Sequence, residues 1–318
     1  EPNALVTVGR GARQEPNVRA TVQEIYHGLE ARSQNCWPSV EHDVMALNNL
    51  AAPFFGAGFY YKTFMWPASF WEKLYEPMIR RAAGLGALSG EADTDAYEKA
   101  YGFCDLLVIG SGPAGLMAAL TAGRAGADVI LCEEDSSLGG RLLAEDEEID
   151  GKPAMEWVAA AIAELQQMEE VTLLPRTTVA GYYDHNFITA LEKITDHLGP
   201  QPIGSGTPRQ KFWKIRAKQV VMAQGAIERP MLFGDNDRPG VMLASAVRHY
   251  INRYAVLPGR ETVFFTNNDN AYLTALAVKA AGGKVEVVDI RENPGGPLVN
   301  KAKEAGIEVH AGYAIVAT

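Results

Sequence analysis

Short, mostly apolar runs alternate with helical stretches through much of the chain after residue 103, a pattern typical of βαβ units around a parallel sheet. Cys104–Gly110 and Asp128–Cys132 have the composition of strands buried on both faces. The stretch Pro113–Gly126 between them predicts a helix. Farther along, the amphipathic stretch Pro153–Met168 and the apolar run Val171–Leu174 predict a second helix and a third parallel strand.

The turn between the first predicted strand and helix carries a G-x-G-x-x-G motif, formed by Gly110, Gly112 and Gly115. Gly110 would permit a tight turn, Gly112 would let the backbone approach a pyrophosphate, and Gly115 would let the helix lie close to the sheet. Pro113 suits the first helical turn and Gly126 suits the helix end. Because these features occur in the required order, we expect a dinucleotide-binding unit; the alternative is a degenerate Rossmann unit that binds nothing.

Five further residues extend the predicted site. Glu133 follows the second strand, where a carboxylate would accept hydrogen bonds from a ribose 2′-hydroxyl and disfavour the 2′-phosphate of NADP. Gly140 and Arg141 could bring backbone amides and a cation toward the nucleotide phosphates, although a surface role for Arg141 is the alternative. Ala180 would lie beside an adenine, and a turn at Gly225 would let a nucleotide pass close to the backbone. The spacing does not separate NAD from the ADP half of FAD.

The residues from 179 to 216 change character. Three stretches there alternate like antiparallel strands and predict an insertion: Ala180–Tyr183, Phe187–Lys193 and Gln210–Arg216. Gln219–Ala226 then predicts a return to a buried strand, and Met242–Val256 predicts a helix. We therefore expect a dinucleotide-binding domain over residues 104–258.

A second βαβ unit is predicted over residues 259–318, with strands at Thr262–Phe265 and Lys284–Asp289 and a helix at Ala271–Ala281. Its turn, TNNDNA, contains none of the three glycines, and Asp269 would repel a pyrophosphate. We expect this unit to keep the fold and to have lost the site. One nucleotide domain with a second βαβ unit nested in its chain resembles two-dinucleotide flavoproteins of the glutathione-reductase type.

The first 48 residues look like part of a small β domain. Ala4–Val8 and Ala20–Tyr26 have the β-branched bias of strands, and the polar stretch Gly9–Asn17 separates them. A short helix is expected at Asp43–Leu50. Glu1 in place of Met, and the strand-like run Ala314–Thr318 at the other end, lead us to expect a fragment of a longer protein.

Residues 49–103 form an aromatic-rich connector. The segment 52–67, APFFGAGFYYKTFMWP, is expected to be either a packed loop or a surface for a partner subunit or a flavin edge. Phe70–Ala83 predicts an amphipathic helix that ends at Gly84. The polar and acidic stretch Leu88–Lys99 is expected to be an exposed linker.

Composition narrows the classes of partner. The chain has 318 residues, of which 47% are hydrophobic, and a formal net charge of −10. That charge disfavours nucleic acid and anionic membranes as partners, and no apolar run reaches the roughly 18 residues of a membrane span. The three cysteines form no C-x-x-C pair, so the sequence indicates no iron–sulfur, zinc or disulfide site. We expect a reducing, cytoplasmic setting.

No catalytic group stands out. The six histidines are isolated and lack the spacing of a metal site, and the sequence has no G-x-S-x-G, no P-loop lysine and no C-x-x-C redox pair. The sequence therefore predicts nucleotide binding without a catalytic or metal-ligating residue, with any chemistry supplied by a cofactor or by another subunit.

Together these segments resemble the alpha subunits of bacterial heterotetrameric sarcosine oxidases. The resemblance covers essentially the whole chain and is carried by the stretches EPNALVTVGRGARQEPN, QNCWPSVEHDVMALNNLAAPF, GAGFYYKTFMWP, GSGPAGLMAALTAGRAG, QGAIERPMLFGDNDRPGVMLASAVRHYINRY and FFTNNDNAYLTAL. The aromatic stretch and the glycine-free TNNDNA turn are the specific parts, because the glycine motif alone would match a very large number of flavoproteins.

The resemblance implies a fold and a set of partners. It implies that residues 1–48 are the remnant of a ferredoxin-like domain without its cluster. It further implies that the first Rossmann motif holds NAD, while FAD and covalently attached FMN belong to the beta subunit and the alpha/beta interface. The family, which also has gamma and delta subunits, oxidises sarcosine with O2 to glycine and H2O2. With tetrahydrofolate it forms 5,10-methylenetetrahydrofolate in a folate-binding domain, which we expect to be absent from these 318 residues.

Matched onto this sequence, the family's NAD contacts fall on nine residues: Gly112, Ala114, Gly115, Glu133, Glu134, Asp135, Arg141, Ala180 and Gly225. Three other classes of protein remain as alternatives. One is a self-contained FAD/NAD(P)H reductase, which the missing C-x-x-C and the lost second glycine loop disfavour. Another is a subunit of an opine or cyanide-forming amino-acid dehydrogenase. The last is a regulatory or assembly module in which NAD is only structural.

Overall fold

The computed structural model describes residues 5–39, 41–54, 58–201, 206–236, 238 and 240–318. The chain divides into two compact units. Unit 1 contains Tyr101–Ala190 and Lys214–Thr318, and unit 2 contains the described residues from Leu5 to Ala100 together with Leu191–Trp213. The strands over residues 97–109, 187–193 and 210–222 each continue from one unit into the other. Segment 191–213 belongs to the same unit as the N-terminal region and not to the unit of its sequence neighbours.

The largest sheet has six strands in the order β8-β5-β4-β11-β10-β9. The strands β4 (Tyr97–Ile109), β5 (Val129–Cys132) and β8 (Val171–Leu174) are parallel, with Leu106 opposite Val129 and Val129 opposite Val171. The predicted strand Cys104–Gly110 is thus the second half of the longer β4, which also takes in the end of the predicted linker Leu88–Lys99. Polar residues at Tyr97–Lys99 hid that extension, because they lack the apolar run of a buried strand.

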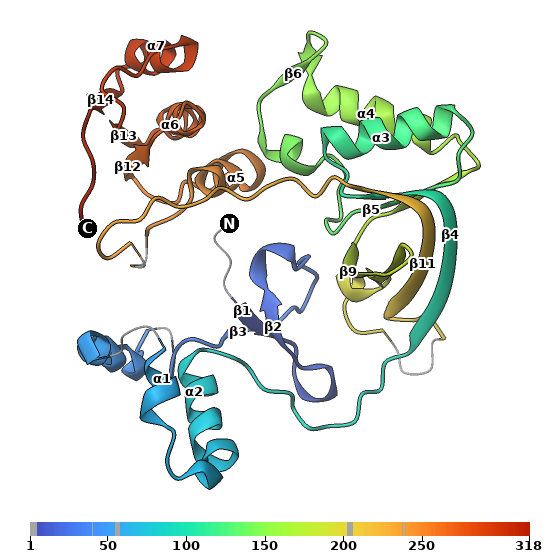
Figure 1. Ribbon diagram of the computed structural model, residues 1–318, viewed down its shortest axis with the longest axis horizontal. Helices are drawn as coiled ribbons and strands as arrows, with labels where there is room; N and C mark the ends of the chain where they lie inside the picture. The colour runs from blue at the N-terminus through green and yellow to red at the C-terminus, as the bar shows by residue number, and fades with distance from the viewer. Residues whose placement is uncertain (1–4, 40, 55–57, 202–205, 237, 239) are drawn as a thin grey trace. The chain divides into compact units, whose positions relative to one another are not determined.

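Two helices pack on this parallel part of the sheet. They are α3 (Pro113–Arg124) and α4 (Ala154–Leu165), which lie side by side in Figure 1. Their apolar faces and the strands beneath form one core, whose fully buried members include Val108, Leu116, Leu131, Val158 and Leu165. The predicted helices and the third parallel strand are therefore confirmed.

The predicted antiparallel insertion is confirmed as β9 (Thr177–Tyr183), β10 (Phe187–Lys193) and β11 (Gln210–Met222). Ala217 donates its amide hydrogen to Asn186 O, and Ile194 donates to Arg209 O, so β10 and β11 run in opposite directions. The separate buried strand predicted at Gln219–Ala226 is wrong. Its first four residues continue β11, and Met222 is 60% exposed.

The second βαβ unit is confirmed, with β12 (Glu261–Thr266), α6 (Asn270–Ala280) and β13 (Lys284–Asp289). A helix α7 (Pro297–Glu304) and a third parallel strand β14 (Glu308–Ala311) extend it. The strand expected at Ala314–Thr318 is wrong, because only one isolated bridge forms there, between Gly234 and Ala317.

Helix α5 (Ala244–Tyr254) joins the two βαβ units within unit 1 and confirms the predicted helix. It packs on α6, and Arg248 on it is buried. Arg248 pairs with Glu145 at 2.8 Å and also contacts the backbone oxygen of Asn270 at 3.3 Å. Arg248 of α5 thus contacts the loop that follows β5 and the first turn of α6.

Unit 2 begins with a three-stranded antiparallel sheet in the order β2-β1-β3, formed by Glu15–Arg19, Leu5–Val8 and Ala31–Ser33. The strand predicted at Ala20–Tyr26 is wrong, since Ala20–Val22 is a 3-10 turn. The chain reverses sooner than expected because Gly9 and Gly11 both adopt positive φ, at 73° and 60°. The partner of β1 therefore comes from the stretch that we expected to be a turn.

The connector is helical in short segments. The helix expected at Asp43–Leu50 is a 3-10 helix, Val44–Phe54, and the helix expected at Phe70–Ala83 is present as Trp71–Tyr75 and α2 (Glu76–Ala82). In the aromatic stretch, residues 55–57 lie outside the described part. The packed-loop interpretation is wrong for Trp66, which is 84% exposed, while Tyr75 donates its hydroxyl to Trp66 O at 2.9 Å.

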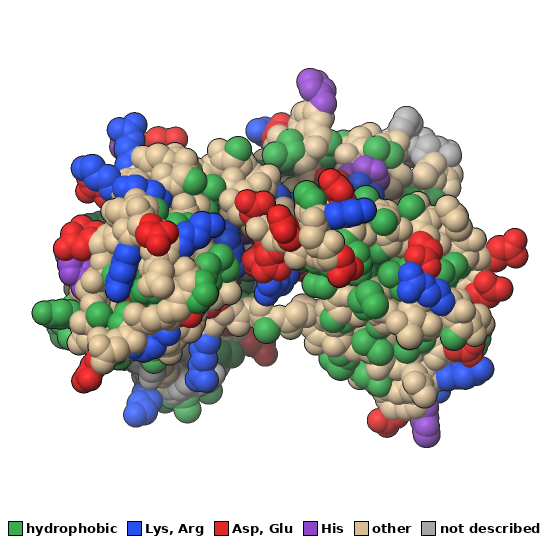
Figure 2. Space-filling model, turned by 90° about the horizontal axis from the view of Figure 1, so that it is seen from above, with side chains coloured by type: hydrophobic (Ala, Val, Ile, Leu, Met, Phe, Trp, Pro, Cys, Tyr) green, Lys and Arg blue, Asp and Glu red, His purple; other side chains and the backbone are tan. Residues whose placement is uncertain are grey.

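Two surface properties bear on partners. No helix in the described ranges is both long and apolar enough to cross a bilayer. On the face drawn in Figure 2, both acidic and basic side chains are exposed.

Candidate functional site

The glycine-rich turn between β4 and α3 has the geometry that a phosphate-binding loop needs. Gly110 has φ +96°, and a Cβ built there would lie 2.6 Å from Ala223 O. A Cβ on Gly115 would lie only 1.9 Å from Gly110 O, so the helix approaches the turn as closely as a glycine allows. A Cβ on Gly112, in contrast, would meet no protein atom within 4 Å. The turn is closed on the protein side and open above Gly112.

Helix α3 presents its N-terminus to this open side. Gly112 is its N-cap and Pro113 lies in the first turn, and no described side chain caps the helix. The first-turn amides of a helix lack intrahelical acceptors and the helix dipole favours an anion there. Ala114 and Gly115 belong to this turn, so their amides are the groups that could hold a diphosphate.

Glu133 reaches back from the end of β5 to the glycine-rich turn. Its Oε2 accepts the Ser111 amide hydrogen at 2.9 Å and the Ser111 hydroxyl at 2.6 Å. Its Oε1 accepts the amide hydrogen of Asp135 at 2.9 Å. A carboxylate has about four acceptor positions, so roughly one remains for a ribose hydroxyl. Glu133 can serve the loop and a ribose at the same time.

Ser111 was not singled out from the sequence, although it occupies the middle of the G-x-G. It is fully buried, and its Oγ also lies 3.2 Å from the amide nitrogen of Gly139, which donates to it. A Cβ on Gly140, next in the chain, would lie 2.8 Å from Gly112 Cα. Ser111 and Gly140 therefore hold the Gly-Gly-Arg turn directly against the glycine-rich turn.

The two acidic residues that follow Glu133 have other partners. Asp135 forms a two-point ion pair with Arg253 of α5, with nitrogen–oxygen distances of 2.5 and 2.8 Å. Burial raises the pKa of the Asp135 carboxyl, but the hydrogen bonds from Arg253 and the Ser137 amide outweigh it and leave that pKa below its ordinary value. The Thr178 hydroxyl lies 3.5 Å from Glu134 Oε1. No sequence signal marked Arg253, which is 118 residues from Asp135.

Arg141, Ala180 and Gly225 lie at the margin of the site. Arg141 is largely exposed and pairs with Glu147 at 2.7 Å. Ala180 is exposed on β9, whose first residue, Thr177, donates its amide hydrogen to Glu133 O at 2.7 Å. Gly225 has φ +71° and follows the segment Ala223–Gln224, whose backbone touches Gly110. Gly140 and the segment before Gly225 thus lie against the glycine-rich turn, whereas Arg141 is turned to its own ion pair and Ala180 is an exposed residue of β9.

The corresponding turn of the second βαβ unit is crossed by an ion-pair network. Arg291 bonds Asp269 at 2.8 Å and Asp289 at 2.7 Å, and the Tyr272 hydroxyl donates to Asp289 at 2.9 Å. Asp289 is fully buried; burial raises its pKa, but the hydrogen bonds from Arg291 and Tyr272 hold that pKa below its ordinary value. Asp269 at the α6 N-terminus therefore already has a cationic partner from the protein.

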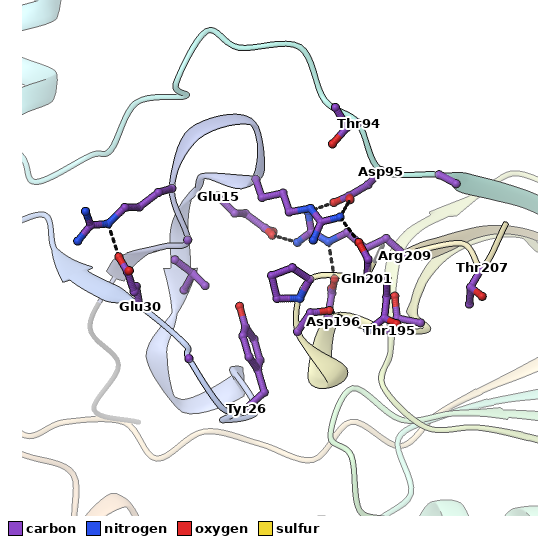
Figure 3. Close-up of a pocket in the computed structure, with 18 of the residues that line it drawn as sticks. Glu15, Tyr26, Glu30, Thr94, Asp95, Thr195, Asp196, Gln201, Thr207 and Arg209 are labelled. Atoms are coloured by element: carbon purple, nitrogen blue, oxygen red, sulfur yellow. Dashed lines mark hydrogen bonds and ion pairs between the residues drawn. The ribbon is translucent and has the colours of Figure 1, made fainter. Parts of the chain in front are cut away.

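Unit 2 contains a cavity of about 480 Å³, shown in Figure 3. Arg209 joins Asp196 at 2.5 Å and also pairs with Glu15, while Arg13 pairs with Asp95 at 2.9 Å. These charges largely neutralise one another and tie the segment before β11 to the first strands. The ion pairs in its lining hold these segments of unit 2 together, and we assign the cavity a structural role.

Two observations concern metal-ligating groups and the Cys104 thiol in the described ranges. No group of three or more His, Cys, Asp or Glu side chains there could hold a metal ion. Cys104 is buried, and burial raises the pKa of its thiol to about 11, so it stays protonated near neutral pH.

Comparisons with known proteins agree with this geometry. The family model described as FAD dependent oxidoreductase matches residues 105–186, which include the glycine-rich turn and Glu133. Sarcosine oxidase subunit alpha from Rhizobium meliloti (strain 1021) is 57% identical over 304 residues, covering 95% of this chain and 31% of that protein. The same subunit from Corynebacterium sp. (strain P-1) is 46% identical over 236 residues, covering 74% and 24%.

Among solved structures, Lactococcus lactis thioredoxin reductase aligns with a TM-score of 0.49 and 18% identity over 67% of this chain and 66% of that one. The chain spans 31% and 24% of the length of these two sarcosine oxidase subunits. The parallel strands, the glycine-rich turn and the family match give an α/β FAD/NAD(P)-binding Rossmann-like fold. The chain is a homologue of the sarcosine oxidase alpha subunits and corresponds to part of their length.

Proposed function

We propose that this chain is the dinucleotide-holding part of the alpha subunit of a heterotetrameric sarcosine oxidase, and that its dinucleotide is NAD. The observation that carries the proposal is the 57% identity to a sarcosine oxidase alpha subunit over 95% of the chain. The glycine-rich turn and the first-turn amides of α3 lie within residues 105–186, the part that matches the FAD dependent oxidoreductase family, which supports a nucleotide role for this turn.

The residues present fit a dinucleotide. The open side of Gly112 leaves room for a diphosphate, and Glu133 keeps an acceptor for the adenosine ribose. The acidic Glu133 favours NAD over NADP, because it lies where a 2′-phosphate would bring like charge. The residues that would hold the dinucleotide, directly or through neighbours, are Gly110, Gly112, Pro113, Ala114, Gly115, Glu133, Glu134, Asp135, Gly140, Arg141, Ala180 and Gly225.

In this proposal the chain itself is not catalytic. Bound flavins, FAD and covalently attached FMN on the beta subunit and at the alpha/beta interface, supply the redox chemistry of the complex. The complex converts sarcosine, O2 and tetrahydrofolate into glycine, H2O2 and 5,10-methylenetetrahydrofolate. The contribution of this chain is to hold NAD as a structural element and to support the beta, gamma and delta subunits.

An activity measurement tests the proposal. Sarcosine-dependent H2O2 production is measured with the purified chain and with the chain assembled with the beta, gamma and delta subunits. We expect H2O2 production only in the assembly. Sarcosine oxidation by this chain alone would contradict the proposal.

A second candidate is a self-contained FAD/NAD(P)H reductase. The match of residues 105–186 to the FAD dependent oxidoreductase family favours it, since the ADP half of FAD would use the same turn. This function predicts that the chain alone binds FAD and oxidises NADH or NADPH with an artificial electron acceptor. The sarcosine oxidase proposal predicts no such turnover.

A further inference from the structure

Arg253 approaches the predicted ribose site although it comes from a distant helix. It lies in the last turn of α5 and contacts Asp135 through both terminal nitrogens, Nη1 to Oδ2 at 2.5 Å and Nη2 to Oδ1 at 2.8 Å. The exposed fractions of the two side chains are 20% and 32%, so water only partly screens the pair. The guanidinium also lies over the Tyr254 ring, 5.6 Å from its centroid.

Asp135 belongs to the same turn as the carboxylate expected to bind the ribose. Its amide hydrogen goes to Glu133 Oε1, and its backbone oxygen accepts the amide hydrogen of Arg176 at 3.0 Å. Its Oδ1 also accepts the Ser137 amide hydrogen at 3.2 Å, which fixes the side chain in the turn. Asp135 therefore holds Arg253 beside Glu133. Both terminal nitrogens of Arg253 are bonded to the Asp135 carboxylate.

The charge balance of this corner bears on nucleotide choice. Arg253 carries one positive charge, whereas Asp135 and Glu133 each carry one negative charge. A neutral ribose 2′-hydroxyl can donate to Glu133, whereas a 2′-phosphate would meet excess negative charge. The guanidinium, a group suited to two-point phosphate binding, is present but already occupied.

We propose that the Asp135–Arg253 pair sets the selectivity of this site for an adenosine ribose without a 2′-phosphate, by keeping the guanidinium from that phosphate. The proposal rests on the dinucleotide site proposed above and adds the residues that decide which nucleotide it accepts. Arg253 is a positioning residue in the resting pair. Released from Asp135, it becomes a ligand for the 2′-phosphate.

The test uses ADP-ribose and 2′-phospho-ADP-ribose, because they carry only the half of the dinucleotide that this corner meets. Their affinities are measured by titration calorimetry with the protein at the length and in the assembly in which it occurs, after removal of bound nucleotide. The variants are Asp135→Asn, which keeps an acceptor for the Ser137 amide but removes the charge, and Asp135→Asn combined with Arg253→Gln. Thermal unfolding confirms that each variant is folded.

In Asp135→Asn we expect the affinity for 2′-phospho-ADP-ribose to rise at least about tenfold relative to ADP-ribose, the size of one charge-assisted contact. In the double variant this gain should disappear. If Asp135→Asn lowers stability but leaves the ratio of the affinities for 2′-phospho-ADP-ribose and ADP-ribose unchanged, the proposal is wrong. The pair would then only stabilise the position of α5. A gain that survives in the double variant would also overturn it, because Arg253 would not be the phosphate ligand.

Failure of the site itself has a different signature. If the unaltered protein binds neither compound, the proposed dinucleotide site is wrong, and the selectivity inference falls with it. If it binds ADP-ribose and the ratio stays fixed in Asp135→Asn, only the selectivity inference is wrong. Should Asp135→Asn not fold, Asp135→Ser, which also retains an acceptor near the Ser137 amide, takes its place with the same expected ratio.

Discussion

Ser111 and Glu133 are joined by two hydrogen bonds to one carboxylate oxygen, from the Ser111 amide at 2.9 Å and from its hydroxyl at 2.6 Å. The pair connects the glycine-rich turn to the end of the neighbouring strand. The carboxylate that would bind the ribose thereby also fixes the turn that would bind the diphosphate. Disturbing Glu133 should therefore affect both ends of the ADP half of a dinucleotide.

Glu133→Ala is expected to lower the affinity for ADP-ribose at least about tenfold, because it removes a charge-assisted acceptor worth roughly 1.5–3 kcal/mol and releases the Ser111 amide. Ser111→Ala keeps the bond from the Ser111 amide to Glu133 but removes the two hydrogen bonds of the hydroxyl, to Glu133 and from the Gly139 amide, and should cost about 1–2 kcal/mol of stability with little loss of affinity. Calorimetric titration measures both, and the exposed Glu148→Ala serves as control. An unchanged affinity in Glu133→Ala would show that the ribose lies elsewhere.

Gly112→Ala and Gly115→Ala form a matched pair that separates binding from folding. A Cβ on Gly112 meets no protein atom, and its φ of −63° suits alanine, so stability should change by less than about 1 kcal/mol. Nucleotide affinity should fall strongly, because the methyl group takes the space left for the diphosphate.

Gly115→Ala places a methyl group 1.9 Å from Gly110 O, and we expect a loss of about 3 kcal/mol in the free energy of unfolding, or failure to fold. Urea denaturation and nucleotide titration of both variants provide the measurements. Full nucleotide affinity in a folded Gly112→Ala protein would contradict the assignment of that open space.

Substitutions in the turn of the second βαβ unit should lower the stability of the protein without changing its affinity for a nucleotide. Asp289→Ala leaves the buried Tyr272 hydroxyl and Arg291 without their carboxylate and should cost about 3 kcal/mol. Asp269→Asn breaks a half-exposed pair and should cost less than about 1 kcal/mol. Neither should change ADP-ribose affinity beyond its stability effect. A large affinity loss in Asp269→Asn would mean that this turn binds a nucleotide.

Unit 1 should lose stability in acid because the pKa values of Asp135 and Asp289 are held below the ordinary value. In the unfolded chain an aspartate has a pKa of about 3.9. The stabilisation is therefore complete above about pH 4 to 5 and is lost as the pH falls through the lower folded-state values. Urea midpoints at pH 6, 5, 4 and 3 should fall accordingly, and Asp289→Asn should flatten the curve. A flat curve for the unaltered protein would contradict these ion pairs.

The parts of the fold that the sequence predicts well are those where local pattern and tertiary environment agree. Val171–Leu174 and Lys284–Asp289 were predicted with the bounds that the structure has, because a short apolar run between a helix and a turn has few alternatives. Ala20–Tyr26 failed because its β-branched residues favour a strand, whereas the positive-φ glycines upstream had already returned the chain to pair with β1. In this segment the geometry of the preceding turn outweighs the β-strand propensity of the residues.

In the candidate site, too, some residues could be predicted from the sequence and others could not. The glycine spacing and the acid after the second strand could be read from sequence because a βαβ turn fixes their positions relative to one another. The Asp135–Arg253 pair could not, since its members are 118 residues apart and nothing local to α5 indicates where its last turn points. Ser111 could have been noticed, because the middle residue of the G-x-G faces the following strand, but its type alone carried no signal.

The most direct test of the central claim identifies the nucleotide that the protein carries. The purified chain is denatured, the protein is removed, and the released small molecules are identified by mass spectrometry and absorbance. NAD without flavin is the predicted result, and it would support a structural dinucleotide in a sarcosine oxidase alpha subunit. FAD released from this chain would contradict that account and move the function toward a self-contained flavin reductase.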